Sequence, residues 1–177
     1  MRKSVKAAVA GMSAAVSVAL LFMSGFFYVF TYVTPMVVGM LISALKKTFS
    51  TSTALCVYAA TSILSLILVP DKESALIYIL FFGYYPLIKH LVEKIKPKIF
   101  SIILKFAVFN VSLLITELIS VFVFNIPFFE DGVFSASMLT VFTVLMNIVF
   151  VLNDIMLSAF LKVYERKLEK IVLKLLK

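Results

Sequence analysis

Residues 1–30, MRKSVKAAVAGMSAAVSVALLFMSGFFYVF, begin with three basic side chains and continue as a long segment without charged residues. The uncharged part exceeds the roughly 18–20 residues that an α-helix needs to cross a bilayer. A cleavable signal peptide also begins with basic residues, but its apolar region is shorter and its small residues come just before the cleavage point. We therefore expect a retained membrane helix over about residues 5–30.

Apolar segments recur along the whole chain of 177 residues, which is 63% hydrophobic with a mean hydropathy of +1.12. A soluble domain of this length cannot bury so much apolar surface. Proline, glycine and charged residues divide the chain into six candidate spans and a basic amphipathic tail. The spans cover about residues 5–30, 33–46, 52–69, 74–92, 97–125 and 135–162, and the tail covers 163–177. We expect an all-α, polytopic protein of the cell membrane that forms one integral membrane domain over residues 1–177.

The charged residues predict the orientation of these spans. Fifteen of the seventeen Lys and Arg residues lie before span one, between spans two and three, between spans four and five, or after span six. Six spans place all of these segments on one side, and basic segments favour the cytoplasm. Both termini are therefore expected to be cytoplasmic, with Asp71, Glu73, Glu130 and Asp131 outside. Because the basic residues flank apolar segments, the net charge of +8 indicates contact with the lipid bilayer and not with nucleic acid.

Polar residues within the spans are the candidates for ligand binding, because they are costly in lipid and usually face protein or water. Glu117 lies in the outer part of span five, on the same helical face as Asn110, with no basic residue evident at its depth. Such a carboxyl group is either protonated, exposed to an aqueous cavity or available to a ligand, or it extends outward to the membrane surface. The polar residues expected nearest to an outer substrate site are Asp71, Lys72, Glu73, Tyr78, Glu117 and Asn147.

Span six carries a polar stripe on one helical face, which either hydrogen-bonds to neighbouring helices or contributes to a ligand site. The stripe consists of Thr140, Thr143, Asn147, Asp154 and Ser158. Lys105 and Asp154 lie at similar depth, about 10–12 Å from the cytoplasmic ends of spans five and six. We expect them to form a neutralising intramembrane pair, with a structural role or as part of a gating network.

Residues 69–86, VPDKESALIYILFFGYYP, combine a proline helix stop, a charged outer turn and two helix-bending residues. Pro70 ends one span, and Gly83 and Pro86 can bend the next one. The segment is either a capped helical hairpin with a kink or an extracellular lid joined to a hinged helix.

The sequence shows no catalytic signature. Its single histidine, His90, lies in a basic segment, and there is no HExxH motif, phosphate-binding glycine loop or pair of metal-binding cysteines. We expect no enzymatic activity and no cofactor or metal. Cys56 has no partner for a disulfide and is expected to be a small packing residue.

The first span is rich in small residues, since nine of the fourteen positions in 7–20 are Ala, Gly or Ser. Helices in lipid pack closely only where side chains are small. This helix either packs within the protein alone or also offers a flat surface to a partner. The residues expected to dock a partner are Ala10, Gly11, Ala14, Ala15 and Ala19.

With its six spans, cytoplasmic termini, basic start and Ala-rich first helix, the chain resembles the substrate-binding (S) components of energy-coupling factor transporters. In that family an Ala-x-x-x-Ala motif on the first helix docks onto a transmembrane coupling subunit, and Ala10 with Ala14, or Ala15 with Ala19, matches it. The resemblance implies an S-component-like bundle, two partner ATPase subunits and capture of a small-molecule substrate on the outer side. The PDKE and FFGYYP stretches also resemble a group of small bacterial membrane proteins without an assigned activity.

The leading hypothesis is a membrane-embedded substrate-binding subunit of an ATP-driven uptake transporter for a small nutrient. The alternatives are a non-enzymatic scaffold of cell-envelope assembly, resembling the rod-shape-determining membrane protein, a membrane protein of another function, or an intramembrane enzyme. An outer cavity lined by Glu117 and Asn147 would favour the transporter, and a filled bundle would favour the scaffold.

Overall fold

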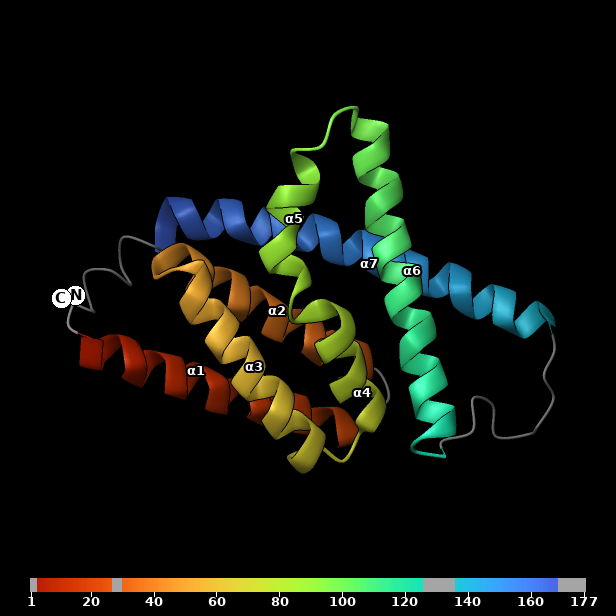
Figure 1. Ribbon diagram of the computed structural model, residues 1–177, viewed down its shortest axis with the longest axis horizontal. Helices are drawn as coiled ribbons and strands as arrows, with labels where there is room; N and C mark the ends of the chain where they lie inside the picture. Colours follow the sequence, from red (N-terminus) through yellow and green to blue (C-terminus); the bar gives the residue numbers. More distant parts are fainter. Residues whose placement is uncertain (1–2, 27–29, 126–135, 169–177) are drawn as a thin grey trace.

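The computed structural model describes residues 3–26, 30–125 and 136–168, and nearly all of them are helical (Figure 1). The expected acidic residues Glu130 and Asp131 and the tail beyond residue 168 lie outside these ranges. No strand occurs in the described ranges, so the all-α prediction is confirmed for them. The elements are α1 (Lys3–Phe22), the 3-10 turn η1 (Met23–Phe26), α2 (Phe30–Thr48), α3 (Thr51–Leu68), α4 (Lys72–Ile77), the π-helix η2 (Tyr78–Phe82), α5 (Tyr85–Glu93), α6 (Lys98–Phe122), α7 (Ala136–Val163) and the π-helix η3 (Tyr164–Leu168).

Five helical segments are long and apolar enough to cross a membrane, which indicates a membrane protein. They are Ser4–Phe26, Thr51–Leu68, Lys72–Glu93, Lys98–Phe122 and Leu139–Arg166. The remaining expected span coincides with α2, whose 19 residues include Pro35, Lys46 and Lys47. Because α2 packs against α1, α3, α4 and α5, it has little need of a lipid-facing apolar surface.

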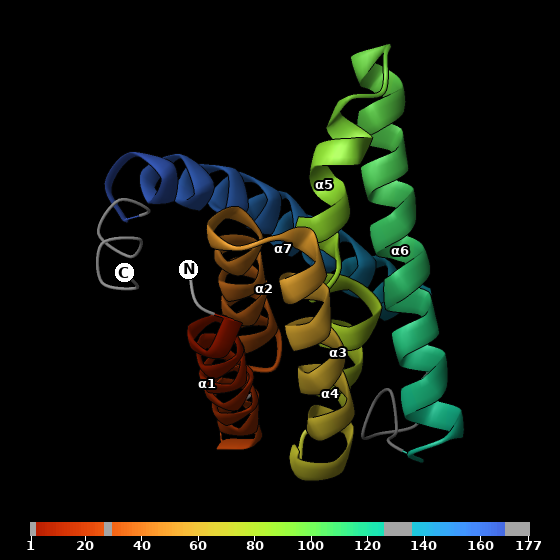
Figure 2. The same ribbon diagram turned by 60° about the vertical axis from the view of Figure 1, so that its left-hand side comes forward.

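Contacts between residues distant in the sequence define one basic end of the molecule. The Lys6 ammonium donates a hydrogen bond to Ser50 Oγ (3.4 Å), which joins the start of α1 to the α2–α3 connection. Lys47 forms an ion pair with Glu165 of η3. The start of α1, the α2–α3 connection and the end of α7 therefore lie at the same end (Figures 1 and 2).

The opposite end is formed by the α1–α2 and α3–α4 connections. Gly25 packs against the ring of Pro70. The Thr31 hydroxyl donates a hydrogen bond to Asp71 Oδ2 (2.9 Å), and the Tyr32 hydroxyl donates one to Glu73. Asp71 and Glu73 thus lie at the end of the molecule opposite Lys6 and Lys47.

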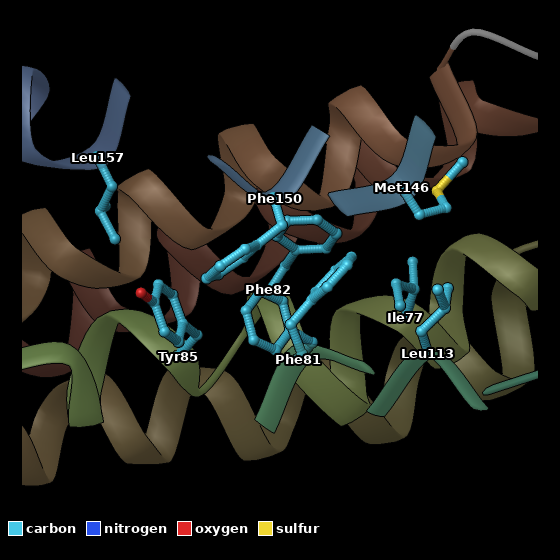
Figure 3. Close-up of a cluster of buried hydrophobic side chains, with 9 residues drawn as sticks. Ile77, Phe81, Phe82, Tyr85, Leu113, Met146, Phe150 and Leu157 are labelled. Carbon is cyan, nitrogen blue, oxygen red and sulfur yellow. The ribbon is translucent and has the colours of Figure 1, made fainter. Parts of the chain in front are cut away.

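The segment Lys72–Glu93 is a broken helix at the centre of the molecule. Two-thirds of its most apolar stretch is buried, whereas the other four candidate spans are mostly exposed. Its aromatic residues form the main core with α6 and α7 (Figure 3). The Phe81 and Tyr85 rings stack at 4.6 Å, and the Phe109 and Phe150 rings stack at 4.8 Å. The cluster contains Ile77, Phe81, Phe82, Tyr85, Phe109, Leu113, Met146, Phe150 and Leu157.

Two glycines allow neighbouring helices to approach this broken helix closely. A Cβ atom on Gly39 of α2 would lie 2.5 Å from the Phe82 backbone oxygen, and one on Gly83 would lie 2.6 Å from the Tyr58 ring of α3. The expected bend occurs at Gly83, between η2 and α5, and Pro86 follows in the first turn of α5. The π-helix that precedes the bend was not predicted.

Helix α7 crosses α6 obliquely instead of running parallel to it (Figures 1 and 2). The two helices meet through the aromatic core, the Asn110–Asn147 amide pair and the Lys105–Asp154 ion pair, and they diverge beyond these contacts. This divergence creates the space described next.

Candidate functional site

A cavity of about 530 Å³ lies between α6 and α7. Helix α6 supplies most of its wall because residues spaced three and four apart face the same side of a helix. The wall is formed by Asn110, Leu113, Leu114, Glu117, Leu118, Val121, Phe122, Leu139, Phe142 and Thr143. Apolar side chains therefore dominate the lining, and three polar residues interrupt it.

Glu117 is the acidic residue of this lining. Its Oε1 atom is buried and has no hydrogen-bond partner within the described ranges. Glu73 of α4 lies close enough for the two carboxylates to interact electrostatically, and Tyr32 of α2 is close to both. The Tyr32 hydroxyl donates to Glu73, so its proton is not available to Glu117. The cavity wall thus holds a carboxylate with an unmet hydrogen-bonding capacity beside a second carboxylate.

The amides of Asn110 and Asn147 join α6 to α7 through two reciprocal hydrogen bonds. Asn110 Nδ2 donates to Asn147 Oδ1 (2.9 Å), and Asn147 Nδ2 donates to Asn110 Oδ1 (3.0 Å). Asn147 lines an adjacent groove of about 440 Å³ instead of the Glu117 cavity. Glu117 and Asn147 therefore line two neighbouring spaces and not the single outer cavity that would favour a transporter.

Asp71 and Lys72 stabilise helix ends. Asp71 Oδ1 accepts a hydrogen bond from the Ser74 backbone amide (3.2 Å) and caps α4. Lys72 Nζ donates to the backbone oxygens of Leu66 (2.9 Å) and Val69 (2.8 Å), and so caps the end of α3. The structure does not bring these two side chains into the α6–α7 cavity.

Of the remaining expected substrate residues, the structure places Glu73 near Glu117 and Tyr78 away from it. Tyr78 is completely buried, with its ring against Tyr58 and its hydroxyl next to Thr61 of α3. It belongs to the interior contact between the broken helix and α3. The six expected residues therefore do not form one site.

Lys105 and Asp154 are in contact, with Lys105 Nζ 3.0 Å from Asp154 Oδ2. Sequence reasoning missed Lys89, which it placed among the basic loop residues. Lys89 is 4% exposed, and its Nζ lies 2.6 Å from Asp154 Oδ1. Tyr85 also donates a hydrogen bond to this carboxylate (2.6 Å), and Lys105 contacts Glu93 (2.8 Å). The sequence contained one signal, because Tyr85, Lys89 and Glu93 are spaced four apart and share a helical face.

The small residues of α1 divide between two faces. Ala14 is buried and Ala10 half-buried in a cluster with Ala54 and Val57 of α3. Gly11, Ala15 and Ala19 are exposed, and no neighbouring atom lies within 4 Å of a Cβ built on Gly11. Of the two Ala-x-x-x-Ala pairs, Ala10 with Ala14 packs inward and Ala15 with Ala19 faces outward.

Cys56 is exposed on α3, so its expected role as a packing residue is wrong. Across ranges 3–26, 30–125 and 136–168, no group of three His, Cys, Asp or Glu side chains is placed to hold a metal ion. No protein-family model matches the chain, and neither the curated proteins nor the solved structures show a significant similarity to it.

Proposed function

We propose that the protein is a membrane-embedded binding subunit for uptake of a small molecule, with ATP hydrolysis supplied by partner subunits. The observation that carries this proposal is the α6–α7 cavity with Glu117 in its wall. Its volume of about 530 Å³ lies within the roughly 300–1,000 Å³ typical of ligand pockets. An apolar lining with a few polar groups is also typical of such pockets.

The proposal includes six spans with both termini in the cytoplasm. Support comes from the two ends of the molecule, since Lys6, Lys47 and the end of α7 meet at one end and Asp71 and Glu73 lie at the other. Basic residues favour the cytoplasmic side. In this proposal the cavity belongs to the outer half of the membrane, because Glu117 lies within electrostatic range of Glu73 at the acidic end.

A partner would dock on the outward face of α1. Gly11, Ala15 and Ala19 leave this face flat, which permits close approach of another membrane helix. Ala15 with Ala19 also matches the docking motif of the transporter components that the sequence resembles. Ala10 and Ala14 are not used for docking in this proposal, because they pack against α3.

The test is purification of the tagged full-length protein from its native membrane in mild detergent, followed by mass spectrometry. We expect a membrane coupling subunit and two ATPases to copurify, and Ala15→Trp to remove them. Ile63→Trp, at a lipid-facing position of α3, is the matched control and should retain them. Recovery of cell-envelope assembly proteins without an ATPase would contradict the proposal and favour a scaffold.

A further inference from the structure

We propose that the α6–α7 cavity selects an organic cation, a small molecule with an apolar body and one protonated amine. This inference rests on the proposed function and names the substrate class of the same site. It follows from which atoms of the cavity wall remain able to form hydrogen bonds, and from the sign of the charge around them.

The polar groups of the wall have already donated their hydrogens within the protein. Both amide hydrogens of Asn110 are accounted for, since Nδ2 donates to the Phe106 backbone oxygen (2.9 Å) and to Asn147 Oδ1 (2.9 Å). The Thr143 hydroxyl donates to the Leu139 backbone oxygen (2.9 Å). Among the described lining residues, no side-chain donor is left for an anion or a carbonyl oxygen of a ligand.

The acceptors, in contrast, are available. Glu117 lines the cavity, and its Oε1 atom, which is buried beneath the surface of the wall, has no hydrogen-bond partner among residues that the structure describes. An ionised carboxylate accepts hydrogen bonds only, and a charged donor gives the strongest ones. An ammonium group on the ligand therefore fits the Glu117 carboxylate better than a hydroxyl or an amide does.

The charge around Glu117 is also negative. Glu73 lies within electrostatic range of Glu117, and the described lining includes no Lys, Arg or His side chain. A bound cation would relieve the repulsion between the two carboxylates, whereas an anion would add to it. The leucines, Val121 and the two phenylalanines of the wall would enclose the apolar body of the ligand.

A lipid acyl chain is the main competing occupant. It would fill the apolar part of the cavity but would leave Glu117 Oε1 without a donor, at the cost of an unsatisfied buried acceptor. The unpartnered carboxylate therefore favours an amine over a hydrocarbon chain.

The test compares three ligands of nearly equal shape: 4-phenylbutylamine, 4-phenylbutanol and 4-phenylbutyrate. The full chain contains no tryptophan, so Phe122→Trp places a single fluorescent reporter at the cavity wall. With this protein in nanodiscs, tryptophan emission gives the affinity for each probe and separates binding from general partitioning into lipid. We expect the amine to bind at least about tenfold more tightly than the alcohol, and the carboxylate to bind most weakly.

Substitutions at Glu117 and at a control position test which residue determines the preference for the amine. Glu117→Gln should lower the affinity for the amine about tenfold, to that of the alcohol, and Glu117→Asp should retain the preference because it keeps the charge. Glu165→Gln removes an exposed carboxylate at the opposite end of the molecule and should leave the affinities for the three probes unchanged. Equal affinities for the three probes, or an amine affinity unaffected by Glu117→Gln, would overturn the organic-cation assignment but leave cavity binding intact. No emission change with any probe would overturn both proposals.

Discussion

Asp154 forms ion pairs with two largely buried lysine side chains, Lys89 and Lys105. Its carboxylate contacts Lys89 at 2.6 Å and Lys105 at 3.0 Å, and both lysine side chains are nearly inaccessible to solvent. Removing one partner from a buried ion pair is costly because it leaves the other charge uncompensated. We expect Asp154→Asn to destabilise the protein by about 3–5 kcal/mol. Thermal unfolding of the detergent-solubilised protein measures this effect.

A matched experiment separates the charge effect from lost packing. Lys105→Gln should cost less than Asp154→Asn, because Lys89 still neutralises Asp154. Combining Asp154→Asn with Lys89→Gln should recover part of the lost stability, since it removes the more buried of the two lysine charges, whereas Lys105 keeps Glu93 as a partner. An Asp154→Asn variant that unfolds at the wild-type temperature would contradict this account.

At the residue scale, the sequence predicted how far along its helix a side chain lies better than it predicted which neighbour that side chain contacts. Counting from the helix ends placed Lys105 and Asp154 at one depth, and the structure joins them. Lys89 and Asn147 were assigned incorrectly because a position along a helix does not fix which neighbour a side chain meets. The reciprocal amide bonds of Asn147 depend on the crossing of α6 and α7, and no local pattern encodes that crossing.

At the scale of the elements, the close contact between α2 and η2 requires a glycine. A Cβ on Gly39 would lie 2.5 Å from a backbone oxygen, which cannot move independently of its helix. We expect Gly39→Ala to destabilise the protein by about 1–3 kcal/mol through this overpacking. Gly11→Ala is the control, because its Cβ meets no neighbour and alanine favours the helix. Circular dichroism during thermal unfolding compares the two variants, and equal stabilities would refute the requirement.

Helix boundaries were predicted well because proline and capping residues mark them in the sequence. Asp71 caps α4 after Pro70, and the helix bends at the predicted Gly83. The π-helix before this bend was missed, because one extra residue in a helical turn leaves no signature in composition or periodicity. The same extra residue shifts the register of the aromatic side chains that follow.

At the scale of the whole molecule, the sequence predicted apolar helices but not the oblique course of α7. Periodicity identifies the face of a helix that is buried, whereas the crossing angle depends on how the side chains of two helices interlock. The cavity beside Glu117 results from that crossing. A sequence argument could therefore nominate Glu117 but not its neighbours in the wall.

The orientation of the molecule supplies the last prediction, which labelling of single cysteines tests. In a Cys56→Ala background, we expect Pro70→Cys to react with a membrane-impermeant maleimide in intact cells, because Pro70 is exposed at the acidic end. Lys96→Cys, in the exposed α5–α6 connection, should react only after the membrane is permeabilised. This pattern follows from the preference of basic residues for the cytoplasm. The reverse pattern would place Glu117 in the cytoplasmic half, where the cavity could not capture a substrate from outside.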